Sequence, residues 1–591
     1  MKLVIAEYLR TLRERDELDR LLPDLLVEMG FVLIARPQTG NRQFGVDLAA
    51  RGRCAEDQSD ELLLLVVKQG DIGRTEWERG DQAVRKSINE IFDVYLRSHL
   101  EPQDAGRRVR IALVTNGELK QTIQANWAGF VTEHSATADI EFWGLDRLAG
   151  LVEKHLLDEH VFRDEDRKQL RRALALSGDS EYDQRDLHNL FLRTLGLEKN
   201  GTLSLPSTSK KDLIKALRIV SLSVQIFASW SANDGDARQG VRAMERALLW
   251  SWHRIQLAEE SHRDGAIADG FSSLWLGYLA TTRLYFEKLQ GHCYVEDGLS
   301  GYCSDGCEFS LVAFELIGTL STIGLAQLAF TASDENVANV HRANASVVAE
   351  ALANAIHNNG ICCSPCLDRH SQDIALGLTL LLATGLIDQA KNWLKALVRN
   401  IDYCYKVKRY APISSDSLDD LAENGGWDDG RTDDRLLNSS WTLPTLAGWC
   451  VVLGMEHSYD ALSEGSKTEY PEVCMQLWHP DKDVFRHLYF KAAHYECGAS
   501  EAPIVLPQGI EGWRSHLDSF IDSEQMQIAN NSSAAKAGLY ALDLIACRHF
   551  GTPIAPVSWY QFVSLLSGSA IELPIDQQTS PPDGGANEAN Q

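Results

Sequence analysis

The chain has 591 residues, of which 44% are hydrophobic and 24% charged, and its formal net charge at pH 7 is −26. At roughly 150 residues per domain the length predicts several domains, and the composition is that of a globular protein, which excludes the disordered and fibrous classes. Because Asp and Glu outnumber Lys and Arg by 83 to 57, the chain as a whole does not attract nucleic acid or anionic membranes, so any contact with nucleic acid needs a local basic patch.

The N-terminal sequence and the apolar stretches bear on localisation. MKLVIAEYLRTLRERDELDR carries mixed charges and no apolar run of signal-peptide length, which predicts a cytoplasmic protein. The best candidate for a membrane span, Leu311 to Ala329, contains Glu315 and two glycines. Since a spanning helix needs about 20 predominantly apolar residues, we expect a buried core helix at this position and no membrane contact.

The 12 cysteines are too sparse for a disulfide framework. They include two clusters, one at Cys303 and Cys307 and one at 362–366. Neither spacing matches a zinc signature well, so buried free thiols are favoured over a metal site.

Residues 1–165 alternate between helical and strand patterns. Apolar residues at helical spacing predict a helix over 18–29 that ends at Gly30, with Pro23 either kinking it or marking its true start. Further elements are predicted as strands at 31–35, 44–50 and 62–68, a helix at 84–96, a strand at 109–114, a helix around 123–130, a strand at 140–143 and a helix at 145–157. This order predicts an α/β domain with a mixed central sheet flanked by helices.

The remainder of the chain has a different pattern. Residues 166–211 are predicted to form a charged helix and a linker. Nearly every segment from about 212 to 550 has helical period, which predicts a helical domain over 212–570. No internal repeat of fixed length emerges, so we expect a large all-α domain, for sensing or assembly, rather than a repeat array. The tail at 571–591 has the composition of a disordered end.

Two charged residues stand out in the predicted strands. Asp47 lies in the run Gly45-Val-Asp-Leu, and Lys68 closes the apolar run 62–67. A hairpin joining these strands would bring the two side by side, and a lysine at the end of a buried strand is costly without an anionic partner. Metal-assisted phosphodiester cleavage needs a carboxylate to hold the cation and a positive group near the phosphate, and this pair could supply both.

The residues around this pair resemble a known family, the Mrr-like restriction-endonuclease branch of the PD-(D/E)xK superfamily. The matching segments are 28–31 (EMGF), 45–47 (GVD), 66–68 (VVK), 111–117 (IALVTNG) and 140–148 (IEFWGLDRL). The resemblance covers about residues 10–160 and implies a restriction-endonuclease-like N-terminal fold. It also implies cleavage of DNA with Mg²⁺ or Mn²⁺, by effectors that often self-associate in bacterial defence against foreign DNA.

The resemblance gives three residues a catalytic role. Asp47 looks like the metal-binding acid, Lys68 like the motif lysine, and Asp19 like the acid that many members carry on the first helix. The sequence departs from the family at Val66, where the motif has an acid and where valine cannot bind a metal. Either a following acid (Asp71, Glu76, Glu78 or Asp81) completes the site, or the domain has lost catalysis.

Three arginines near the predicted site, Arg42, Arg51 and Arg74, are candidates for contacts with DNA phosphates, although such a cluster is usually a solvated surface. Motifs for nucleotide-phosphate binding, serine hydrolysis, zinc proteolysis and dinucleotide binding are absent from the sequence.

Three readings of the function follow. The leading prediction is a metal-dependent DNA endonuclease effector that acts as a homo-oligomer or with a partner protein, regulated or assembled by its helical domain. The first alternative is an inactive nuclease fold serving as a DNA- or partner-binding scaffold. The second is a helical interaction protein whose α/β domain is unrelated to nucleases, which a large separation of Asp47 and Lys68 would favour.

Overall fold

The structure is a computed structural model of the whole chain. It describes residues 2–14, 18–35, 44–53, 59–80, 83–156, 164–179, 182–204, 209–234, 236–258, 265–303, 306–329, 335–424, 431–490, 498–520, 523–524, 527–528 and 532–560. The predicted disordered tail at 571–591 lies outside these residues.

The N-terminal part of the chain forms a five-stranded mixed sheet with the strand order β1-β2-β3-β4-β5. Its strands are β1 (Val32–Ala35), β2 (Leu48–Arg53), β3 (Asp60–Lys68), β4 (Arg108–Thr115) and β5 (Asp139–Trp143). The pairs β1–β2 and β2–β3 are antiparallel, whereas β3–β4 and β4–β5 are parallel. The carboxyl ends of the three parallel strands therefore meet at one edge of the sheet.

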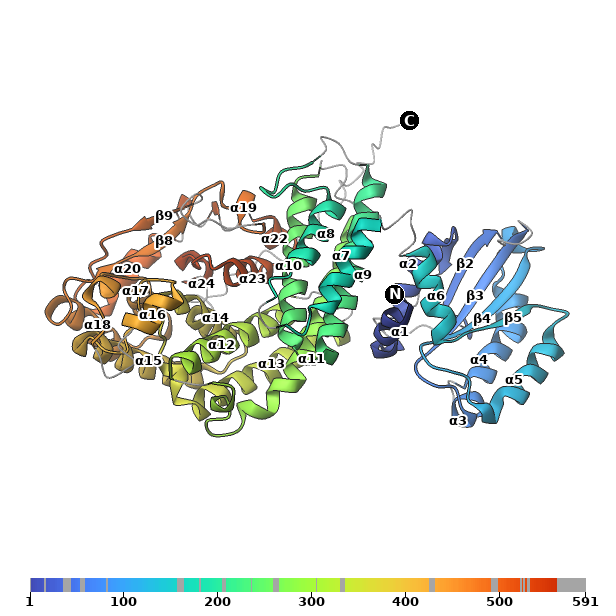
Figure 1. Cartoon of the computed structure of the whole chain (residues 1–591), viewed down its shortest axis with the longest axis horizontal. Helices are drawn as coiled ribbons and strands as arrows, with labels where there is room; N and C mark the ends of the chain where they lie inside the picture. The colour runs from blue at the N-terminus through green and yellow to red at the C-terminus, as the bar shows by residue number, and fades with distance from the viewer. Residues whose placement is uncertain are drawn as a thin grey trace, which may run out of the picture.

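Helices cover both faces of this sheet (Figure 1). On one side are α1 (Lys2–Thr11), α2 (Asp19–Glu28) and α6 (Leu145–His155); on the other are α3 (Arg74–Glu78), α4 (Val84–Glu90) with its π-helical continuation Ile91–His99, and α5 (Gln121–His134). Alternate residues of β3 serve the two faces: Leu63, Leu65 and Val67 pack on the α1 side, and Leu62, Leu64 and Val66 on the α4 side. Burial on both faces explains why this strand is a continuous apolar run.

The coarse prediction for this part is confirmed, and three details differ. Helix α1 was not predicted, although Ile5, Tyr8, Leu9 and Leu12 are buried at helical spacing. Helix α2 contains Pro23 inside it rather than starting there. Strand β2 begins only at Leu48, because the preceding residues form a turn with positive φ at Phe44 and Gly45.

The rest of the chain is mainly helical and forms an elongated body beside the α/β part (Figure 1). Its first half contains α7 (Asp164–Ala175), α8 (Arg185–Leu195), α9 (Lys210–Asp234), α10 (Ala237–Gln256), α11 (Gly265–Cys293), α12 (Gly306–Leu328) and α13 (Glu335–Asn358). Its second half contains α14 (Ser371–Ala383), α15 (Ile387–Val407), α16 (Leu418–Asn424), α17 (Thr442–Leu453), α18 (Glu456–Thr468), α19 (Val484–His487), α20 (Ile510–Asp518), α22 (Ser533–Lys536), α23 (Ala541–Phe550) and α24 (Pro556–Tyr560).

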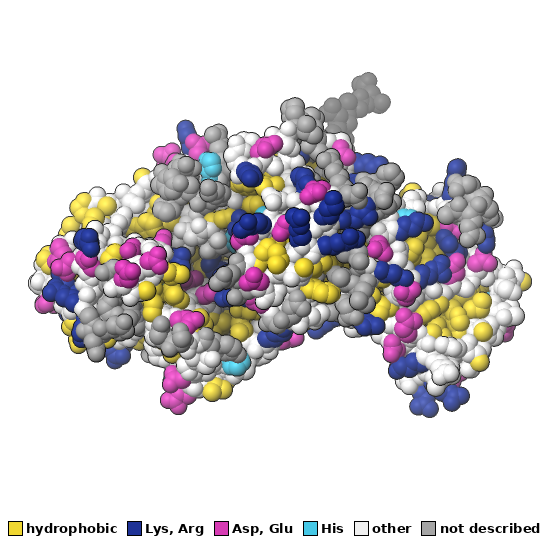
Figure 2. All heavy atoms as spheres, viewed as in Figure 1, with side chains coloured by type: hydrophobic (Ala, Val, Ile, Leu, Met, Phe, Trp, Pro, Cys, Tyr) yellow, Lys and Arg dark blue, Asp and Glu magenta, His cyan; other side chains and the backbone are white. Residues whose placement is uncertain are grey.

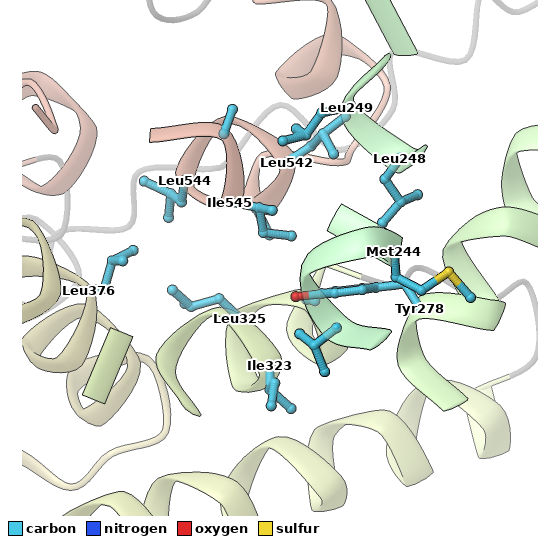
Figure 3. Close-up of a cluster of buried hydrophobic side chains, with 14 of the residues drawn as sticks. Met244, Leu248, Leu249, Tyr278, Ile323, Leu325, Leu376, Leu542, Leu544 and Ile545 are labelled. Atoms are coloured by element: carbon cyan, nitrogen blue, oxygen red, sulfur yellow. The ribbon is translucent and has the colours of Figure 1, made fainter. Parts of the chain in front are cut away.

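The core of this body joins helices that are far apart in sequence. Figure 3 shows Leu542, Leu544 and Ile545 of α23 lying among side chains of α10, α12 and α14, together with Tyr278 of α11. Helix α23, near the end of the described chain, thus packs on α10, α12 and α14.

Four short strands interrupt the predicted all-α region. Strands β6 (Ser439–Ser440) and β7 (Cys474–Met475) pair in parallel, and β8 (Leu477–Pro480) and β9 (Gly498–Glu501) pair antiparallel. Runs of two to four residues are too short to show an alternating pattern in sequence.

Two helices among the described residues, within 210–233 and 306–328, are long and apolar enough to cross a membrane by length and composition. In each, most of the most apolar window is buried inside the protein, 61% and 78% respectively. The second is the stretch expected to be a core helix, and Ile317, Leu320 and Leu325 on it lie in the core. Burial by neighbouring helices accounts for this apolar character.

Helix α9 connects the helical body to the α/β part, where it packs against α1. Tyr8 of α1 donates a hydrogen bond to the Gln225 side chain of α9. Arg218 of α9 forms ion pairs with Asp24 and Glu28 of α2, at 3.2 and 3.0 Å. The α1–α2 hairpin therefore contacts both the sheet and the helical body.

Candidate functional site

Asp47 is held against strand β3 by the start of the β2–β3 hairpin. Its backbone N–H donates to the carbonyl of Leu65 at 2.9 Å, and one oxygen of its carboxylate accepts the N–H of Val67 at 2.7 Å. The hairpin register, in which Leu48 pairs with Leu65, places Asp47 next to the carboxyl-terminal end of β3.

Lys68 is the last residue of β3 and lies close enough to Asp47 to lower the pKa of its carboxyl group by charge attraction. The predicted juxtaposition of these two residues is present. Val66 lies two residues before Lys68 on β3, and its side chain is fully buried in the hydrophobic cluster on the α4 side of the sheet. The acid position of the motif is therefore filled by a core side chain.

Glu14 is the second carboxylate at this site, and the sequence did not identify it. It lies in the connection between α1 and α2, and its charge raises the pKa of Asp47. Among the charged side chains of the described residues, Lys68 and Glu14 are the two that shift this pKa. Glu14 sits in a run of mixed charges, RERDELD, that has no pattern to mark one acid as special.

The α1–α2 connection is tied to the sheet by a buried asparagine. The Asn116 side-chain amide, just after β4, donates to the carbonyls of Leu9 and Leu12 at 2.9 and 2.7 Å. Its oxygen accepts the N–H of Gly70 at 2.8 Å. Asn116 thereby fixes the end of α1, and hence the segment leading to Glu14, against the turn that follows Lys68.

A cavity of about 340 Å³ lies at this edge of the sheet. It is lined by residues from α1, from the turn after β3 and from the turn after β4, including Arg10, Gln69, Asp71 and Asn116. In sheets with parallel strands, ligands commonly bind outside the carboxyl ends of the strands. Gln69, which follows Lys68 in the chain, lines this cavity, whereas Asp47, Glu14 and Lys68 are not among its lining residues.

Burial is the main cause that raises the pKa of Asp47, and Glu14 raises it further. The Val67 N–H and Lys68 act in the opposite direction. A carboxylate whose ionised form is disfavoured by burial and by a nearby negative charge is a favourable setting for a cation, which would stabilise that form. Mg²⁺ is typically held by one or two carboxylates, with waters and substrate oxygens completing its shell, so this donor set fits the metal.

The other acids proposed for the site are not among the described groups that shift the pKa of Asp47. Asp71 accepts the N–H of Glu118 at 3.0 Å, and Glu76 accepts the N–H of Gly73 at 2.9 Å within its own helix. Glu78 is exposed on α3. Asp81 lies outside the described residues. Asp19 begins α2, five residues after Glu14, and is not among the groups that shift the pKa of Asp47; its role remains a prediction.

The predicted DNA-binding arginines differ in their surroundings. Arg51 pairs with Asp104 at 2.5 Å and with Glu101 at 2.7 Å, so its charge is already neutralised. Arg74 is exposed at the first position of α3. Arg42 lies outside the described residues. The contact of each with DNA remains a prediction.

Across the described residues, no group of three or more His, Cys, Asp or Glu side chains is arranged to hold a metal. This result includes the two cysteine clusters, whose members among these residues form no disulfide. A metal at Asp47 and Glu14 would therefore need water or substrate oxygens for the rest of its coordination.

Comparison with known proteins gives no relatives: no family model, curated protein or solved structure matches this chain.

Proposed function

We propose that the N-terminal domain is a restriction-endonuclease-like, metal-dependent DNA endonuclease. In this proposal the protein is a cytoplasmic effector of bacterial defence against phage or other foreign DNA, and the helical body regulates or assembles it. The main support is that Asp47 lies beside the carboxyl end of β3, where the charges of Lys68 and Glu14 both act on its carboxyl group.

Each of these side chains has a role in the proposed chemistry. Asp47 and Glu14 would hold Mg²⁺ or Mn²⁺, which when bound supplies a Lewis acid and a more acidic water. The ammonium group of Lys68 would stabilise the negative charge that develops on the phosphate. Since one such site cuts one strand, cleavage of both strands needs a second copy or a partner protein.

The proposal is tested by cleavage of plasmid and linear DNA with Mg²⁺ or Mn²⁺, with and without the products of neighbouring genes. We expect Asp47→Ala and Lys68→Ala to abolish cutting and Glu14→Gln to slow it by about tenfold or more, since loss of a charge-stabilising group commonly costs at least that factor. Asp139→Asn is the matched control, because Asp139 pairs with Arg108 at the opposite end of the parallel strands.

A second candidate function is a nuclease fold retained for binding DNA or a partner without cutting. The buried Val66 at the acid position favours it. Absence of cutting by the wild type under every condition, with metal-independent DNA binding intact, would replace the first proposal with this one.

A further inference from the structure

A second, larger polar cavity lies in the helical body, where α7, α8, α9 and α10 meet. Its volume is about 640 Å³. The carboxyl end of α8, the loop to Lys199, the first turns of α9 and Arg254 on the last turn of α10 line it. Cavities of roughly 300–1,000 Å³ are the size that binds nucleotide-sized molecules.

Arg254 is the deepest charged side chain of this cavity, with 3% of its surface exposed. Its Nε donates to the carbonyl of Leu195 at 2.9 Å, which fixes the guanidinium plane at the end of α8. Its Nη1 is buried and has no hydrogen-bond partner among the described residues. Burial lowers the pKa of Arg254, and no carboxylate of the described residues acts on it. A buried cation without an anion is costly, so this arrangement calls for an anionic partner.

The other charged groups of the cavity are either paired or exposed. Arg193 forms an ion pair with Asp166 at 3.0 Å. Lys199 is exposed at the rim, beside the exposed Glu198. Asp212 is exposed as well, and its carboxylate accepts the Ser209 hydroxyl at 2.6 Å. Arg254 and Lys199 are therefore the cations that remain for a ligand.

The outer surface near the cavity is also basic. Figure 2 shows Lys and Arg side chains gathered over α7 to α9, although the chain as a whole is strongly acidic. Lys168, Arg171 and Arg172 of α7 are exposed on it. Such a surface raises the local concentration of anions and speeds their approach.

We propose that this cavity binds a small phosphorylated molecule, whose phosphate is held by the terminal nitrogens of Arg254 and by Lys199. A guanidinium end offers two parallel N–H groups that match the oxygens of a phosphate. The remaining volume receives the organic part of the ligand.

Helix α9 links the cavity to the α/β domain. Leu213 and Ala216 of α9 line the cavity, and Arg218, two residues further on, pairs with Asp24 and Glu28 of α2. The cavity and the contact that holds the α1–α2 hairpin therefore share helix α9 but lie on different faces of it.

The proposal is tested by calorimetric titration of the full chain with AMP, adenosine, citrate and a short thymidine oligonucleotide. We expect saturable AMP binding, weaker citrate binding and none for adenosine, since the phosphate carries the recognition. Arg254→Gln, which retains a donor for Leu195, should weaken AMP binding by about tenfold or more. Arg185→Gln is the matched control, because this exposed arginine of α8 pairs with Asp183 and does not line the cavity.

Lys199→Glu provides a second variant on an exposed position, which keeps the test valid if Arg254→Gln does not fold. It should weaken AMP binding several-fold by reversing one charge at the rim. The proposal is overturned if AMP does not bind the wild type, if the oligonucleotide binds where AMP does not, or if every folded variant of Arg254 and Lys199 binds AMP like the wild type. DNA cleavage is not part of these readouts, so an inactive nuclease site would leave the result unaffected.

Discussion

Asp47 and Asp373 are carboxylates whose pKa values both lie above the ordinary range, with burial as the main cause in each case. Their neighbours differ. The charges of a lysine and of a second carboxylate both act on Asp47, a setting that suits a cation. Asp373, on α14, has Arg548 and Arg369 nearby, which lower its pKa, and it lies inside the helical body. The surroundings of Asp47 suit a metal-binding site, whereas the burial of Asp373 affects the stability of the fold.

The predicted effect of Asp373 is a dependence of stability on pH. Burial raises its pKa from 3.8 to about 7, so the folded protein favours the protonated form. The stabilisation that comes from protonated Asp373 is fully present below the pKa of this group in the unfolded chain. It is lost as the pH rises through the pKa of Asp373 in the folded protein. Asp373→Asn should therefore raise the free energy of unfolding at about pH 8 by on the order of 1–2 kcal/mol.

The measurement is denaturant unfolding of both proteins across the range from about pH 4 to 8. The advantage of Asp373→Asn should shrink steadily as the pH is lowered. An advantage that stays constant with pH, or a variant less stable at high pH, would show that the carboxylate is well compensated when ionised.

At the scale of secondary structure, the strands that carry Asp47 and Lys68 could be predicted because their apolar patterns depend on local sequence. The hairpin then brings the two together without further information. Glu14 could not be found in this way. Its position depends on a contact between Asn116 and the end of α1, about a hundred residues apart in sequence, and such tertiary contacts leave no periodic signal. The same holds for Arg254, because its burial without an ion pair among the described residues is a property of the folded helices.

The turn before β2 is the element that positions Asp47. Gly45 has φ +83°, and a Cβ atom there would lie 2.0 Å from the carbonyl oxygen of Ser87 on α4. Gly45→Ala should destabilise the protein by about 2–4 kcal/mol, since it combines backbone strain with a clash against main chain. Gly30→Ala is the matched control, because Gly30 has φ +93° but nothing within 4 Å of the modified position.

Thermal and denaturant unfolding of the two variants separate the cost of the backbone strain from the cost of the clash with Ser87. Gly30→Ala should cost only about 1 kcal/mol, the cost of the backbone conformation alone. An equal loss of unfolding free energy in the two variants would mean that α4 shifts at little cost to accommodate the added methyl group, so that the turn is not rigidly positioned.

At the scale of the whole molecule, the α/β domain and the helical body meet where α9 packs on the α1–α2 hairpin. Glu14 lies in the connection between the two helices of this hairpin, so the junction links the helical body to the candidate active site. Arg218 is its main ion-pairing residue, with about a quarter of its side chain exposed, 23%.

Removing Arg218 should loosen this junction. Arg218→Ala breaks two partly buried ion pairs and should cost about 1–2 kcal/mol, with faster hydrogen exchange in α2. Arg185→Ala removes an exposed pair with Asp183 and should change stability by less than about 0.5 kcal/mol. Unchanged exchange in α2 after Arg218→Ala would mean that apolar contacts alone hold the hairpin.

The central claim is that Asp47 and Glu14 hold a divalent cation beside Lys68. Its most direct test is a titration of the full chain with Mn²⁺, followed by electron paramagnetic resonance, which does not depend on the trigger for cleavage. We predict one site in the wild type and in Asp139→Asn that is lost or strongly weakened in Asp47→Asn and in Glu14→Gln. Mn²⁺ binding that is the same in all four proteins would contradict the claim.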